Sequence, residues 1–68
     1  MLPRSEHERI LLIANEKYAR KHNSTGCEVD DIKNEVLRAG GDMQDVYAIL
    51  AIELDKMIAG DEDKENLN

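Results

Sequence analysis

Aromatic residues are nearly absent from this 68-residue chain, which has two tyrosines and neither phenylalanine nor tryptophan. A hydrophobic core must therefore be built from leucine, isoleucine, valine and methionine. The chain also has a single cysteine, Cys27, so it cannot form an internal disulfide, and no run of Cys and His has the spacing of a zinc site. We expect neither covalent nor metal stabilisation, and no cofactor.

The chain length indicates one domain near the lower limit for independent folding. Below about 70–80 residues, a single core rarely supplies more than about 3–5 kcal/mol of stability. Disulfides, metals or oligomerisation usually supply the rest, and of these oligomerisation remains here. The sequence therefore predicts a single domain over residues 1–60 that is completed by homodimerisation.

The N-terminal sequence has no segment suited to secretion or membrane insertion. It turns polar after Pro3, and the apolar stretch 10–13 is too short for a signal peptide or a membrane span. We therefore expect a cytoplasmic protein without membrane contact. The glycosylation sequon at 23–25 is then unused, because it is modified in secreted chains.

The spacing of apolar residues predicts an all-α fold, a small three-helix bundle without strands. A first helix is expected over 5–22, where Ser5 can cap the start and basic residues fill the last turns. A second helix is expected over 26–39, capped by Thr25 or, in a shorter form, by Asp30.

Glycines mark the predicted ends of the second and third helices. The pair at 40–41 ends the second, since glycine readily adopts the left-handed backbone found at helix C-termini. Asp42 can cap a third helix over 43–59, which Gly60 then ends. The charged residues 61–68 are expected to form a short disordered acidic tail.

The third segment contains an apolar run, residues 46–52, that covers the whole circumference of a helix at about 100° per residue. A helix of this kind needs cover on every side. The larger stripe is assigned to the core and comprises Met43, Val46, Tyr47, Leu50, Leu54, Met57 and Ile58. Ile49 and Ile52 then lie on the opposite side, among charged residues.

Two isoleucines on a charged helix face are typical of a protein contact. The core stripe of the first helix consists of Ile10, Leu11, Ala14 and Tyr18. Leu12 lies outside that stripe and extends this apolar surface. Glu53 and Lys56 provide a charged rim. We therefore expect self-association through Leu12, Ile49, Ile52, Glu53 and Lys56.

Charge is distributed unevenly along the chain. Residues 1–25 hold five basic and three acidic groups, 5 − 3 = +2, and residues 26–68 hold four basic and twelve acidic groups, 4 − 12 = −8. Acidic residues bracket the turn between the second and third helices and are able to dock on a basic surface of a partner protein. These predicted partner-binding residues are Glu28, Asp30, Asp31, Glu35, Asp42 and Asp45. Helix capping is the alternative explanation for part of them.

Catalytic residues are not expected in this chain. Cys27 lies near a helix N-terminus, where a thiol can become reactive, but a nucleophile also needs a positioned base and a pocket. The acids lack the spacing of a calcium loop, and the glycine pair is no phosphate-binding loop. The sequence does not predict an enzyme.

The expected function is that of a small acidic protein-binding module, a regulator, adaptor or inhibitor of a partner protein. The alternative is a nucleic-acid-associated regulator, because two helices joined by a glycine turn have the outline of a helix-turn-helix. The second helix of such a pair must approach phosphates. Here it opens with Asp42 and Asp45, which phosphates repel, so nucleic acid is not the expected partner.

Overall fold

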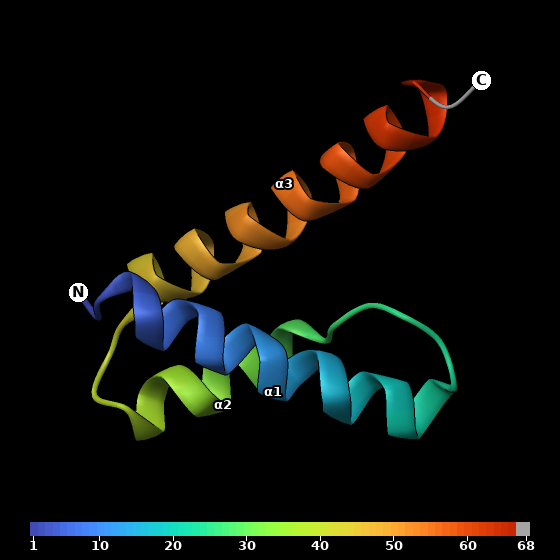
Figure 1. Ribbon diagram of the computed structural model, residues 1–68. Helices are drawn as coiled ribbons and strands as arrows, with labels where there is room; N and C mark the ends of the chain where they lie inside the picture. The colour runs from blue at the N-terminus through green and yellow to red at the C-terminus, as the bar shows by residue number, and fades with distance from the viewer. Residues whose placement is uncertain (67–68) are drawn as a thin grey trace.

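The computed structural model describes the backbone of residues 1–66 and the side chains of residues 1–58. It contains three helices, α1 (Arg4–His22), α2 (Val29–Arg38) and α3 (Met43–Asn66), and no strand within residues 1–66. Each helix contacts the other two. In Figure 1, α1 and α2 lie side by side while α3 crosses them near the N-terminus and then projects beyond them. The predicted all-α, three-helix fold is confirmed.

The first helix starts one residue earlier than expected and has a different cap. α1 begins at Arg4, and the carbonyl of Pro3 accepts hydrogen bonds from the amides of Glu6 at 3.0 Å and His7 at 3.2 Å. Ser5 therefore lies inside the first turn, and its predicted capping role is wrong. The predicted end at His22 is confirmed.

The second helix starts between the two predicted starts, later than the form capped by Thr25 and earlier than the form capped by Asp30. α2 begins at Val29, and neither Thr25 nor Asp30 is its cap residue. The preceding segment is held outside the helix because Gly26 packs on the ring of Tyr18: a Cβ atom at Gly26 would lie 2.9 Å from that ring. Gly26 also has a φ of +150°, which side-chain-bearing residues rarely adopt.

The glycine pair ends α2 as predicted. Gly40 has a φ of +83°, and its amide donates to the carbonyl of Leu37 at 3.2 Å. The amide of Gly41 reaches back to the carbonyl of Val36 at 2.9 Å. This pair of bonds is the Schellman motif, which satisfies carbonyls left open at a helix end. It turns the chain sharply into α3.

The third helix continues past its predicted end. Gly60 does not stop α3, which runs to Asn66; a glycine inside a helix costs roughly 1 kcal/mol relative to alanine but does not forbid the helix. The disordered tail predicted for residues 61–68 is therefore not confirmed by the backbone. The side chains of residues 61–66 and the whole of residues 67–68 lie outside the described part of the chain.

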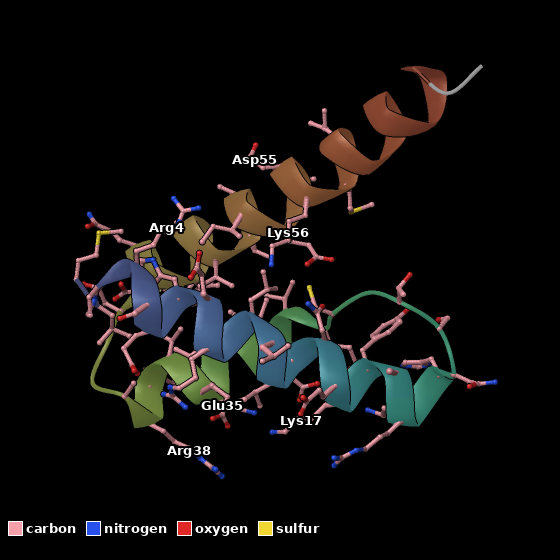
Figure 2. All side chains as sticks on the ribbon, viewed as in Figure 1. Arg4, Lys17, Glu35, Arg38, Asp55 and Lys56 are labelled. Atoms are coloured by element: carbon pink, nitrogen blue, oxygen red, sulfur yellow. The ribbon has the colours of Figure 1, made fainter. Side chains whose placement is uncertain are left out.

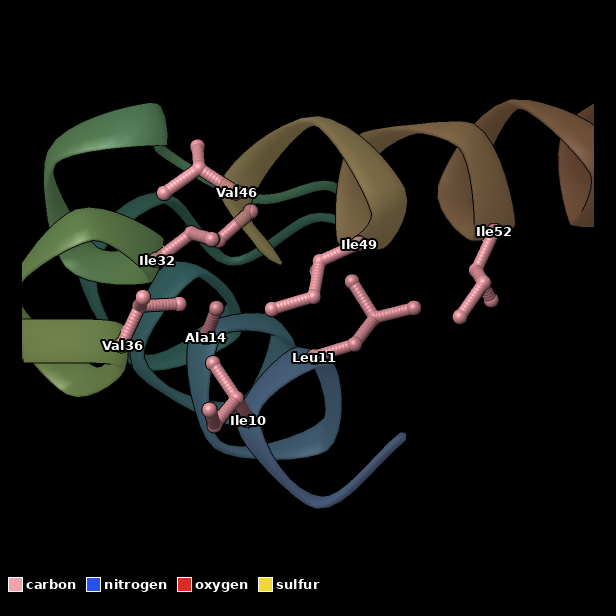
Figure 3. Packing of buried hydrophobic residues seen from close by; sticks show 8 residues of the cluster. All are labelled: Ile10, Leu11, Ala14, Ile32, Val36, Val46, Ile49 and Ile52. Carbon is pink, nitrogen blue, oxygen red and sulfur yellow. The ribbon is translucent and has the colours of Figure 1, made fainter. Parts of the chain in front are cut away.

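The core lies where the first half of α3 crosses α1 and α2. Its buried apolar side chains are Ile10, Leu11, Ala14, Ile32, Val36, Val46, Ile49 and Ile52. In Figure 3, Leu11 lies beside Ile49, and Ile52 follows about one turn along α3. Ile49 and Ile52 are 0% and 8% exposed. The faces of α3 assigned from the sequence are thus wrong: the predicted contact face is the core face.

Candidate interaction surface

The solvent side of α3 carries a continuous row of large apolar side chains. We call it the α3 apolar face, and it consists of Met43, Tyr47, Leu50, Leu54, Met57 and Ile58. Five of these are 45–63% exposed, and Leu50 is half-buried. Most of the stripe that the sequence assigned to the core is therefore on the surface.

The spacing within this face is that of a helix–helix seam. From Met43 to Met57, the apolar residues follow at intervals of four, three, four and three, which is the pattern of coiled-coil core positions. With a rise of about 1.5 Å per residue, the stretch from Met43 to Ile58 is roughly 22 Å long. A narrow stripe of this length fits another helix better than a flat or concave surface.

Figure 2 fixes the orientation of the second half of α3. Lys56 points toward α1 and α2, whereas Asp55 points away from them. The side of α3 that turns away from the core thus combines one acidic group with the α3 apolar face. Fully burying a large aliphatic side chain stabilises a protein by about 1.5–3 kcal/mol. Because these side chains are about half exposed, the isolated chain obtains only about half of this stabilisation at each position.

A cleft of about 350 Å³ opens where α3 diverges from the second half of α1. It is lined by Asn15, Ala19, Thr25, Gly26, Glu53, Lys56 and Met57. Among the described side chains, no donor reaches the buried Oδ1 atom of Asn15. Met57 belongs both to this cleft and to the α3 apolar face, so the two surfaces are continuous.

The residues predicted for self-association do not form one surface. Ile49 and Ile52 are in the core, Glu53 and Lys56 line the cleft, and Leu12 is exposed on α1. The difference has a physical reason, because charged neighbours indicate a solvent-facing side of a helix only where they are themselves exposed. One of those charges is in fact buried, and the other two flank the cleft.

The buried charge is Asp45, which is 0% exposed. Its Oδ1 atom accepts from the backbone amide of Leu2 at 2.7 Å and lies 2.7 Å from Nε2 of His7. Its Oδ2 atom accepts from the amide of Asp42 at 3.0 Å. The hydrogen bond with His7, supported by the two amides, lowers the pKa of Asp45 to about 2. Asp45 is therefore a structural residue, and its predicted role in partner binding is wrong.

Asp42 and Asp45 together form the capping arrangement at the start of α3. Oδ1 of Asp42 accepts a hydrogen bond from the amide of Gln44 at 3.0 Å. In turn, the amide of Asp42 donates a hydrogen bond to Oδ2 of Asp45. This reciprocal pairing satisfies amides that a helix start leaves open. The predicted cap at Asp42 is confirmed.

Two further acids are paired within the chain. Oε1 of Glu28 lies 2.9 Å from Nε2 of His22, and its Oε2 lies 3.4 Å from Nζ of Lys21. The hydrogen bond with His22 is the main reason that the pKa of Glu28 is lowered. Oε2 of Glu35 lies 3.6 Å from Nζ of Lys17 and 3.7 Å from Nη1 of Arg38, and Figure 2 shows the three side chains.

Asp30 and Asp31 differ from the other predicted partner-binding acids. Asp30 is exposed and Asp31 half-exposed, and neither forms an ion pair with a side chain of residues 1–58. They lie in the first turn of α2, where negative charge also suits the helix dipole. Among the side chains of residues 1–58, these two of the six predicted acids form neither a hydrogen bond nor an ion pair, so their carboxylates are free for a partner.

Cys27 packs against the core from the loop before α2. Burial raises the pKa of its thiol, and the carboxylate of Glu53 raises it further. Both effects favour the thiol over the reactive thiolate. Within the described part of the chain, no three His, Cys, Asp or Glu residues are grouped so that they could hold a metal ion.

Within the described residues, none of the helices has the length and apolar character needed to cross a membrane. Comparison with known proteins adds no further identification: no protein-family model matches the chain, and neither a curated protein nor a solved structure is significantly similar to it.

Proposed function

We propose that this chain is a small protein-binding module of the cytoplasm that acts as a regulator, adaptor or inhibitor of another protein. The observation that carries the proposal is the α3 apolar face. Exposed apolar patches of this kind mark interaction sites in small proteins. The proposal assigns binding to the side of α3 opposite the one predicted from the sequence.

The chemistry of the face defines what it can bind. Tyr47 presents a large ring with a polar tip, and Leu54 and Met57 present flexible or branched aliphatic surface beside it. Such a stripe is complementary to the apolar side of an amphipathic helix. Asp30 and Asp31 add negative charge, which would favour a partner with basic residues and speed its association.

The nucleic-acid alternative has less support. The basic groups in the last turns of α1 are the cations a phosphate backbone would need. Two of them, Lys17 and Lys21, already lie within ion-pair distance of acids in or beside α2. A phosphate backbone would have to compete with Glu35 and Glu28 for these lysines.

A pair of matched variants tests the proposed function. Leu54 on α3 and Leu12 on α1 are 58% and 59% exposed, so Leu54→Glu and Leu12→Glu introduce the same charge at equal exposure. We expect immobilised wild-type chain and Leu12→Glu to capture the same protein from a lysate, and Leu54→Glu to lose it. Retained capture by Leu54→Glu would contradict the proposal. Salt-dependent retention of the chain on DNA would favour the alternative instead.

A further inference from the structure

We infer that a second copy of this chain covers the α3 apolar face, with the two α3 helices packed antiparallel about a twofold axis at the level of residue 52. The inference rests on the proposed function, because it names an occupant of the same surface. A second copy and another protein would compete for this surface, so self-association is measured on the isolated chain.

The face is complementary to itself in this arrangement. A twofold axis at residue 52 places Tyr47 opposite Met57 of the second copy and Leu50 opposite Leu54 of the second copy. Each pairing occurs twice, as the symmetry of a dimer requires. Four of the six residues of the α3 apolar face are paired in this way, and each pair joins one class of seam position to the other. The central part of the face is therefore complementary to itself.

Charge favours the antiparallel arrangement over the parallel one. Residues 61–65 contain four acids and one lysine, so parallel helices would bring two acidic segments together. Antiparallel helices separate these segments and direct each toward the start of α3 in the other copy. There each segment approaches the N-terminus of α3 in the other copy, which is the positive end of that helix's dipole, and the chain's own N-terminus, which lies beside the start of α3 (Figure 1). The helix dipoles also favour the antiparallel arrangement, because it places the positive end of each α3 helix near the negative end of the other.

The flanks of the face leave room for this approach. Ala51, which follows Leu50 on the solvent side, is exposed and small, so it permits close contact between helices. Glu53 borders the other flank, where it lines the cleft together with Lys56. Its charge therefore lies on the cleft side of α3.

Cysteine pairing tests the arrangement directly. In a Cys27→Ser background, Tyr47→Cys and Met57→Cys chains are mixed in equal amounts, oxidised slowly and analysed by mass spectrometry. In the antiparallel dimer, the two copies of position 47 are roughly 15 Å apart along the axis, too far for a disulfide between two Tyr47→Cys chains. We therefore expect about ten times more of the mixed 47–57 disulfide than of either the 47–47 or the 57–57 disulfide. Random collision of the two chains would give only about twice as much of the mixed disulfide as of either self-pairing. The Asp55→Cys chain is the control. Position 55 lies outside the α3 apolar face, so its rate of disulfide formation measures random collision alone.

Two outcomes of the disulfide experiment would overturn the inference. Dominant 47–47 and 57–57 disulfides would show parallel helices, and pairing no faster than that of Asp55→Cys would show no specific dimer. Sedimentation of the unmodified chain at about 200 μM provides the second measurement, since small interfaces are weak. We expect wild type and Leu12→Glu to approach the mass of a dimer and Leu54→Glu to remain a monomer. A monomeric wild type that still loses its protein partner through Leu54→Glu would overturn the second copy and leave the proposed function standing.

Discussion

Nε2 of His7 lies 2.7 Å from Oδ1 of Asp45, and this buried contact joins the first turn of α1 to the first turn of α3. The same carboxylate holds the backbone amides of Leu2 and Asp42. One acidic side chain therefore connects the N-terminus, α1 and the turn that follows α2. Removing it would leave buried donors without a partner, which costs more than the net contribution of the bonds themselves.

The first prediction concerns the pH dependence of stability. The pKa of Asp45 is about 2 in the folded chain, below its ordinary value of 3.8. A lowered pKa in the folded state stabilises the fold above the unfolded-state pKa, and this contribution is lost as pH falls from about 4 through about 2. We expect Asp45→Asn to lower the Tm at pH 7 by roughly 10 °C or more.

The measurement is urea unfolding of wild type and Asp45→Asn at several pH values. The difference between the two should shrink steadily as pH falls below about 4, because wild type loses its ionised carboxylate there. Asp30→Asn is the control, since Asp30 is exposed and forms no ion pair among residues 1–58. A wild-type advantage that stays constant down to about pH 2 would show that Asp45 does not stabilise the fold through its charge.

The second prediction compares the two glycines of the turn. Gly40 has a φ of +83° with open space around it, so Gly40→Ala should cost about 1 kcal/mol through backbone strain alone. At Gly41 a Cβ atom would lie 2.6 Å from Oδ2 of Asp45 and 2.8 Å from Cγ1 of Val36. We expect Gly41→Ala to cost about 2–3 kcal/mol by displacing this carboxylate. Equal unfolding free energies for the two variants would contradict the close packing at Gly41.

The third prediction tests which side of α3 is the core. Ile49→Ala should cost about 2–5 kcal/mol, because a fully buried side chain leaves a cavity. Leu54→Ala should change stability by less than about 0.5 kcal/mol in dilute solution, where the chain is monomeric. Chemical denaturation at low micromolar concentration measures both. A larger loss for Leu54→Ala than for Ile49→Ala would restore the faces assigned from the sequence.

The fourth prediction separates surface acids from paired acids. Replacing both Asp30 and Asp31 with Asn should leave stability within about 0.5 kcal/mol while reducing the salt dependence of binding to a basic partner. Glu35→Gln should instead cost up to about 1 kcal/mol, because it loses its contacts with Lys17 and Arg38. If partner affinity and its salt dependence are unchanged in the Asp30 and Asp31 variant, these acids serve the helix dipole alone.

The sequence predicted the helices well because their signals are local. The end of α1 at His22, the glycine end of α2 and the cap at Asp42 each depend on a few neighbouring residues. The starts of α1 and α2 were less predictable. Pro3 caps through its backbone, and the segment before Val29 is shaped by the contact of Gly26 with Tyr18 across the loop.

The interaction surface was assigned to the wrong side for a related reason. Because α3 is apolar on nearly every side, periodicity alone cannot choose between its two faces. The charge of Asp45 suggested a solvent-facing side, yet its partner His7 comes from another helix, 38 residues away in the chain. A buried polar pair of this kind is invisible in a local pattern, although a histidine on the core stripe of α1 was a usable signal.

The most direct test of the central claim, that α3 is an interface completed by a second copy, is amide hydrogen exchange in residues 53–58 as a function of protein concentration. This part of α3 diverges from α1 and α2 (Figure 1) and has one side open to solvent, so its amides gain protection when another molecule covers it. We expect protection to rise at least about tenfold between about 5 and 500 μM in wild type and Leu12→Glu, as association stabilises the helix. In Leu54→Glu it should stay at the dilute value. Protection that is independent of concentration in wild type, or equal in wild type and Leu54→Glu at about 500 μM, would contradict the claim.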